Sequence, residues 1–208
     1  MENKPVFIFF LAVLLTLPNL GAASVNKMTA EVSSEMIQIN TGFDGMNLLL
    51  FGTTNEADDI IIVIKGPRET NIIRKKTRVA GIWVNTGKVT IENVPTFYAI
   101  ASTRPLTQIT AKSVLKINEI GAENISTNIL ENSDENTIAA SDEYMGALVR
   151  LKNRNGLYVA EPVKIALIKN QLFRANINFP ANVSTGKYTA QIYSFKNGLL
   201  IDVINKPI

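Results

Sequence analysis

The sequence contains no cysteine and no histidine. Without cysteine the chain has no disulfide, no thiolate nucleophile and no Cys-ligated zinc, so its fold must depend on packing. Without histidine it lacks the commonest general base, the commonest transition-metal ligand and the usual protonation switch near neutral pH. A Ser-His-Asp triad is therefore excluded. We predict a protein that is not an enzyme and that carries no metal and no cofactor.

Charge and long apolar runs are also scarce. The 21 Lys and Arg nearly balance 18 Asp and Glu, and the net charge of +3 is too small to predict nucleic-acid binding. The longest apolar run, Val6–Leu17, has 12 residues, fewer than the ~20 that cross a bilayer as a helix. It follows Lys4 and precedes Gly21-Ala22-Ala23, which predicts a signal peptide over residues 1–23 and export to the periplasmic side of the inner membrane. An uncleaved anchor is the alternative.

Short apolar runs bounded by Gly, Pro and Asn dominate residues 24–104 and are typical of strands. With few helices between them, they predict a mainly β fold, an antiparallel Ig-like β-sandwich that is either one composite or two small ones. The predicted strands cover residues 36–39, 48–51, 59–65, 72–79, 82–84, 88–91 and 97–101.

The pattern changes to helical spacing over residues 105–156, which predicts a two-helix insertion. One helix is expected from Pro105, at the first helical position, to a stop at Gly121. A second is expected over Ser141–Arg154, before Asn155-Gly156, with an acidic stretch between the two. One face of this second helix is expected to carry Tyr144, Met145, Leu148 and Leu151.

Strand signals return over residues 157–208. Phe173 to Phe179 and Tyr188 to Tyr193 alternate apolar and polar side chains, with Tyr193 expected on the wet face. Asn197-Gly198 predicts a type I′ hairpin turn. These strands either complete the first sandwich or form a small second one.

The basic segment Lys65–Asn85 is the leading candidate site, since it holds six Lys or Arg against one acid. On a strand, Arg74, Lys76 and Arg78 would share one face and Lys75 the other. Such a face could bind an anionic ligand, a lipid headgroup or an acidic partner. The alternative is a charged edge strand that prevents sheet-to-sheet aggregation.

Four further residues are candidates for ligand or partner binding: Arg68, Trp83, Tyr98 and Arg104. An acidic section from Glu119 to Glu143 could dock internally on the basic strand or face away from it. The acidic pairs Asp58-Asp59 and Asp142-Glu143 are not expected to be metal or catalytic sites, and the first pair, just before a strand, is expected to be a solvated turn.

Several of these segments also carry a family resemblance. They are Phe51-Gly52, Lys65-Gly66-Pro67, Arg74-Lys75-Lys76, 79–85, 94–98, 102–106, 172–175 and 186–188. Together they resemble a family of alphaproteobacterial transmembrane proteins. The resemblance implies an exported β-rich domain that faces the periplasm and usually continues into a C-terminal transmembrane helix. This sequence has no second apolar span before Ile208, so a truncated chain, an N-terminal anchor and a soluble protein all stay open.

The leading functional hypothesis is a non-enzymatic accessory or interaction module for an envelope or inner-membrane partner, such as a transporter. The alternative is a periplasmic domain that binds a small anionic ligand through Arg68, Arg104 and nearby aromatics.

Overall fold

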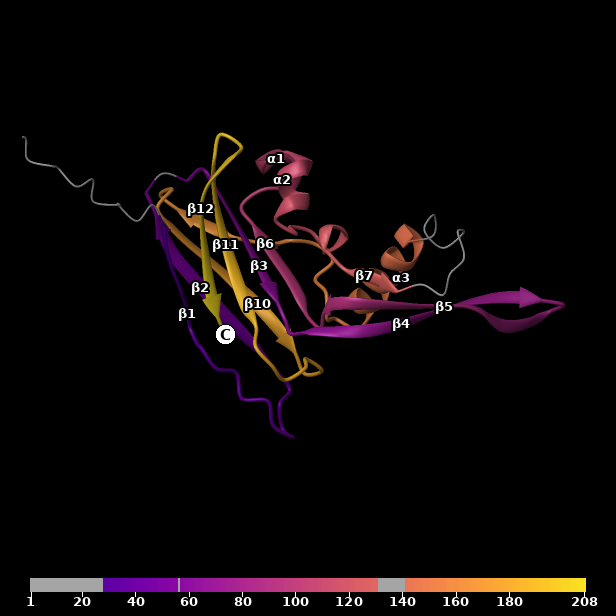
Figure 1. Cartoon of the computed structure of the whole chain (residues 1–208). Helices are drawn as coiled ribbons and strands as arrows, with labels where there is room; N and C mark the ends of the chain where they lie inside the picture. Colours follow the sequence, from indigo (N-terminus) through magenta and orange to yellow (C-terminus); the bar gives the residue numbers. More distant parts are fainter. Residues whose placement is uncertain (1–27, 56, 131–140) are drawn as a thin grey trace, which may run out of the picture.

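The computed structural model describes residues 28–55, 57–130 and 141–208. The predicted signal peptide, 1–23, and the middle of the acidic section, 131–140, lie outside the described residues. Within them the chain is mainly β, with several antiparallel sheets and few helices, as the sequence predicts. Figure 1 shows a body of packed sheets and a long hairpin that projects away from it.

Two sheets form the body, with strand orders β1-β2-β10-β9 and β12-β11-β3-β6-β8. β10 pairs with β2 and β11 pairs with β3, so the C-terminal strands complete sheets that the N-terminal strands begin. Neighbouring strands are antiparallel apart from the β6–β8 pair. The strands are β1 (Met28–Val32), β2 (Gly45–Thr54), β3 (Asp59–Lys65), β6 (Tyr98–Ser102), β8 (Val163–Lys164), β9 (Ala166–Ile168), β10 (Leu172–Pro180), β11 (Thr189–Lys196) and β12 (Leu199–Pro207).

Strand β3 is apolar throughout its centre because both of its faces are buried. Ile60, Ile62 and Ile64 lie in the core between the two sheets. Ile61 and Val63 belong to a second core on the other face of the sheet. That second core is covered by α1 (Leu106–Ile109), α2 (Lys112–Ile117) and η1 (Ala122–Asn124). A continuous apolar run rather than an alternating one is what a doubly covered strand requires.

The second core accounts for two wrong predictions. Tyr193 is 3% exposed rather than wet, because the helices cover this face of the sheet and its hydroxyl donates to the Asn118 carbonyl. The helix predicted from Pro105 to Gly121 is broken, since Thr110 is fully extended with φ −154° and ψ 171°. The Thr110 hydroxyl donates to the Gly198 carbonyl at 2.8 Å, and this contact with the distant β11–β12 turn replaces a helical turn.

Two strand predictions also need correction. Residues Met36–Ile39 form no strand; Ile37 and Ile39 instead pack over the end of the first core beside Phe179. Their apolar side chains are therefore explained by packing on the core and not by membership of a paired strand. The runs 82–84 and 88–91 belong to one strand, because a bulge at position 86 keeps the pairing continuous.

The third sheet, β4-β5-β7, lies beside the body and is covered on one face by α3. Tyr144 and Leu148 of α3 pack on Val89, Ile91 and Val94 of β5. The predicted bounds of this helix are confirmed, and Leu151 at its far end is 46% exposed. The elements are β4 (Arg68–Val79), β5 (Ile82–Pro95), β7 (Asn128–Leu130) and α3 (Ser141–Arg154).

Candidate functional site

The hairpin of β4 and β5, residues 68–95, forms a projecting arm (Figure 1). Its turn is Ala80-Gly81, with φ of 49° and 85°, the left-handed conformation that a tight two-residue hairpin requires. β4 is an edge strand, since the third sheet has the order β4-β5-β7. α3 lies against the half of the arm nearer the body, and the tip extends beyond it.

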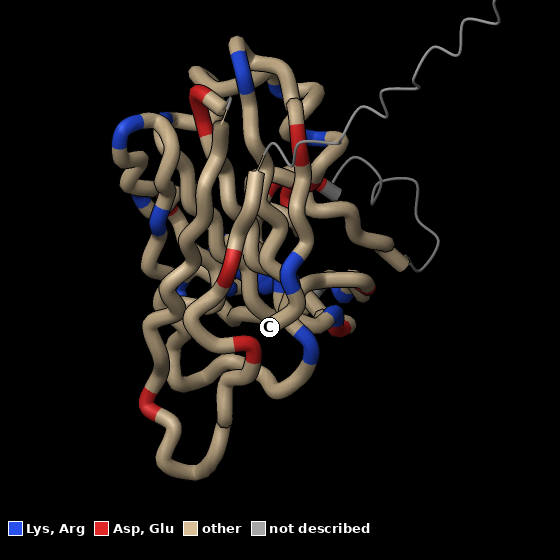
Figure 2. The backbone as a smooth tube through the Cα atoms, turned by 90° about the vertical axis from the view of Figure 1, so that its left-hand side faces the viewer, with Lys and Arg blue, Asp and Glu red and all other residues tan. Residues whose placement is uncertain are grey.

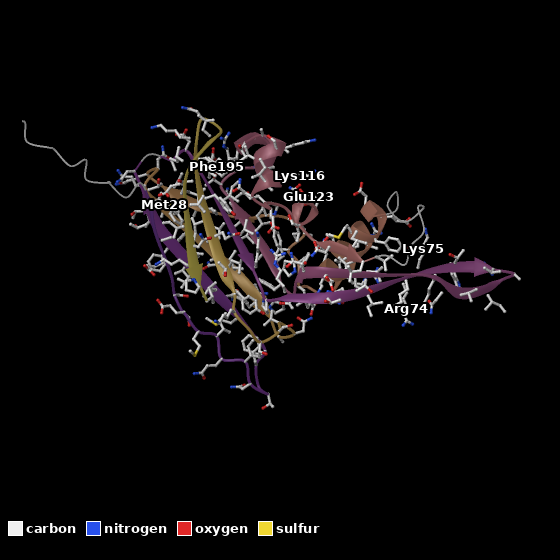
Figure 3. The ribbon with its side chains drawn as sticks, in the orientation of Figure 1. Met28, Arg74, Lys75, Lys116, Glu123 and Phe195 are labelled. Atoms are coloured by element: carbon white, nitrogen blue, oxygen red, sulfur yellow. The ribbon has the colours of Figure 1, made fainter. Side chains whose placement is uncertain are left out.

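The arm has two different faces. β5 has two β-bulges, at Asn93 and at position 86, and at each of them β5 has one residue more than β4. β4 itself has no bulge, so its side chains alternate regularly between the two faces of the arm. Arg74 and Lys75 lie on opposite sides of the arm in Figure 3. Lys75 is on the side covered by α3, where its Nζ lies 3.0 Å from Glu143. The outer face carries Arg74, Lys76 and Arg78, all exposed.

The acidic section does contact the rest of the chain, but it pairs with cations other than Arg74, Lys76 and Arg78. Glu119 accepts bonds from Lys65 at 2.6 Å and Arg68 at 3.1 Å, and Glu143 pairs with Lys75. Across the described ranges no ion pair joins Arg74, Lys76 or Arg78 to a carboxylate. Charges of both signs are interspersed along the body in the view of Figure 2. The outer face of the arm is therefore a local concentration of cations without acids.

Glu119 joins the arm to the body. Partial burial raises the pKa of this carboxyl, but the hydrogen bond and charge of Lys65 and the Ser126 N–H outweigh it and lower the pKa to about 2. Arg68 also donates from Nη1 to the carbonyls of Asn93 at 2.7 Å and Ser126 at 3.3 Å. This candidate residue is thus engaged in holding the base of the arm.

Tyr98 is fully buried, which removes it from a surface site. Its hydroxyl donates to the Glu119 carbonyl at 2.9 Å and accepts the Gly121 N–H at 2.8 Å. Burial raises its pKa far above the usual range, so the phenol stays protonated.

Arg104 lies at the other end of β3 from Arg68. Its guanidinium donates two hydrogen bonds to the Asp59 carboxylate, from Nε at 2.8 Å and from Nη2. These bonds lower the pKa of Asp59, with help from the Thr103 hydroxyl at 2.7 Å. Asp59 is 3% exposed, so the prediction of a solvated turn is wrong at this position. Because six residue steps of β3 span about 20 Å, Arg68 and Arg104 do not share a pocket.

A groove of about 270 Å³ runs between the edge of β4 and α3. Arg74 lines this groove together with two arginines that the sequence reasoning missed, Arg150 and Arg154. None of the three has an ion pair in the parts of the chain that the structure describes. Ile72 and Leu151, 53% and 46% exposed, give the groove apolar walls. The four-residue spacing of Arg150 and Arg154 on a correctly predicted helix was the available signal.

The distal tip of the arm is apolar. Val79, Ile82, Trp83 and Val84 are 52%, 70%, 66% and 44% exposed, and none belongs to a core cluster. Trp83 pairs directly opposite Arg78, so the two side chains share the outer face. The distal candidates Lys76, Arg78 and Trp83 therefore lie together, apart from the Arg74 groove.

The described residues contain no group of three or more acidic side chains close enough to hold a metal ion. Over residues 27–208 the chain matches the model of a family described as "putative transmembrane protein (Alph_Pro_TM)". The chain belongs to this family. It matches no curated protein and no solved structure.

The description of this family refers to transmembrane proteins. None of the helices in the described ranges is long and apolar enough to span a bilayer. The projecting arm and the groove at its base are thus the prominent surface features of a family member whose described part is mainly β.

Proposed function

We propose that the chain is an exported, membrane-associated and non-enzymatic interaction module that works on the periplasmic side of the inner membrane. Its partner is an envelope or inner-membrane protein, such as a transport component. The export-like N-terminus, the missing histidine and cysteine and the family's description support this proposal. In this proposal the Ig-like sandwich serves as a rigid body and the arm carries the binding site.

The groove with three arginines is the observation that carries the proposal. Arginine forms planar, bidentate bonds to carboxylates, and Arg74, Arg150 and Arg154 line one groove that has no acidic residue in its lining. The groove runs along the free edge of β4, where an extended segment can add as a further strand. We therefore expect the partner to supply an extended, acidic segment, with apolar side chains against Ile72 and Leu151.

Replacing Arg74, Arg150 and Arg154 by serine should weaken partner binding at least about a hundred-fold, because each hydrogen bond to a charged group contributes roughly 1.5 kcal/mol or more. A photo-crosslinker at Leu151, used in native membranes, would identify the partner. Titration of the purified partner against wild type and variant then measures the loss.

The matched control replaces Lys112, Lys116 and Lys187 by serine, which removes the same charge from exposed positions elsewhere. It should bind the partner as wild type does. Equal binding by the groove variant, or an equal loss in the control, would refute the groove as the site.

The alternative function is binding of a small anionic ligand. It is favoured by a hollow of about 590 Å³ beside Arg104, which is also lined by a second cation, Lys164, and by one acid, Glu161. The wall is otherwise weakly polar or apolar, as in many ligand sites.

A thermal-shift screen with phosphate, sulfate and citrate tests this alternative. At a hundred times the dissociation constant a ligand adds about 2.7 kcal/mol. For a chain of this size the midpoint should therefore rise roughly 5–10 °C. The variant Lys164→Ser should lose that shift, whereas Lys187→Ser should retain it. If no anion raises the midpoint, this alternative fails.

A further inference from the structure

The tip of the arm is the second unassigned feature, and it is independent of the groove. We propose that Val79, Ile82, Trp83 and Val84 insert into the interfacial layer of an anionic lipid bilayer. These four side chains fall within six consecutive residues around the Ala80-Gly81 turn, at the end of the arm that projects farthest from the body (Figure 1).

The exposure of the tip has no explanation within the fold. Single exposed apolar residues are ordinary on a protein surface, but a contiguous group marks a contact surface. α3 covers the face of the arm around Ile73 and Val89, and none of the tip residues joins that cluster. In the described ranges none of the tip side chains is therefore part of a buried core.

The order of charge along the arm matches an anionic bilayer. From Thr70 to Ile91 the sequence has five cations and no acid. Lys76 and Arg78 lie directly behind the apolar tip on β4, and Arg78 is opposite Trp83. A bilayer of anionic lipids offers a negative plane above an apolar layer in the same order, and tryptophan prefers that boundary.

The dimensions agree with shallow insertion. Arg78 and Lys76 are two and four residues before Ala80, which places them roughly 7 and 13 Å behind the turn. Interfacial elements bury their apolar side about 5–10 Å deep, so the tip would sit below the phosphates and these cations at their level. The outer edges of a two-stranded hairpin keep unpaired backbone groups, which require water and prevent deeper penetration.

Trp83 is the only tryptophan, so its fluorescence reports on the tip alone, even in the full chain with its apolar N-terminal run. Vesicles of phosphatidylcholine with about 30% phosphatidylglycerol should shift its emission to the blue, and brominated acyl chains should quench it. Phosphatidylcholine vesicles alone should give a much smaller shift, because each Lys or Arg near an anionic surface contributes roughly a five-fold gain in affinity.

A co-sedimentation assay with the same vesicles and with variant proteins separates the apolar and the cationic contributions to membrane binding. Ile82→Ser with Trp83→Ser should weaken the anion-dependent part of binding more than about ten-fold, because burial of these side chains is lost. Lys76→Ser with Arg78→Ser should weaken it about 25-fold. The controls Ile117→Ser with Leu199→Ser remove equally exposed apolar side chains elsewhere, and Arg150→Ser with Arg154→Ser alters only the groove. Both controls should bind as wild type does.

Three results would overturn the proposal. The first is Trp83 emission that does not change with anionic vesicles. The second is an equal change with neutral vesicles. The third is a shift that grows with protein concentration before any lipid is added, which would assign the tip to a second copy of the chain. Unchanged circular dichroism of the tip variants will show that they remain folded, since their side chains contact no core.

Discussion

Replacing Gly52 by alanine should destabilise the protein by about 3 kcal/mol or more, which is the upper range for overpacking a core. Gly52 lies in β2, between β1 and β10. An added Cβ would come within 2.1 Å of the Thr29 carbonyl oxygen and 2.4 Å of Cζ of Phe173. The first contact is with backbone and the second with a ring that is fully buried, so neither neighbour can move away cheaply.

Urea unfolding followed by circular dichroism measures this loss as a lower midpoint. Gly42→Ala is the matched control, because a Cβ there would lie 3.6 Å from Oδ1 of Asn40, an ordinary contact. It should change stability by no more than about 0.5 kcal/mol. If both variants unfold at the wild-type midpoint, the packing of Phe173 over Gly52 is not as described. The close approach also gives Phe51-Gly52, one of the segments of the family resemblance, a structural reason.

Replacing Glu119 by alanine should cost about 3 kcal/mol, because it removes the common partner of two cations. The side chains of Lys65 and Arg68 are 13% and 35% exposed and would be left without that carboxylate. The change also removes an acceptor from the Ser126 N–H. Calorimetry should show a lower midpoint, and proteolysis should cut the arm faster if its base loosens.

The same carboxylate makes stability sensitive to acid. The folded-state pKa of Glu119 is about 2, below the usual value near 4.5, so the unfolded chain binds more protons between these two values. The stabilisation is complete above about pH 4.5 and is lost as the pH falls towards 2. Glu119→Gln should flatten the dependence of the urea midpoint on pH in this window, whereas the exposed control Glu35→Gln should leave it unchanged. An unchanged slope in Glu119→Gln would contradict this role.

Sequence patterns correctly predicted the helices, strands and turns that are determined by their own residues. β3 and α3 have the predicted bounds, and Asn197-Gly198 forms the predicted turn with φ of 50° and 80°. The predictions failed where a distant contact decided the outcome. Thr110 breaks a helix because it bonds to Gly198, 88 residues away, and Tyr193 is buried by helices that periodicity along its own strand does not reveal.

Among the candidate site residues, too, strand alternation placed some correctly, and distant contacts decided the others. Strand alternation was enough to place Arg74, Lys76 and Arg78 on one face. Arg68, Tyr98 and Arg104 looked equally available in the sequence, but each is engaged by a partner 15 or more residues away. Arg150 and Arg154 were missed because only the folded chain brings α3 beside β4.

The arm is longer than the helix that supports it, and this difference determines how far the tip lies from the groove. β4, with 12 residues, spans about 40 Å, whereas the 14 residues of α3 span only about 21 Å. About half of the arm is therefore bare, and this half acts as a spacer. Any surface that the tip touches is held roughly 20 Å from Arg74 in the groove, which leaves room there for an extended segment of a partner.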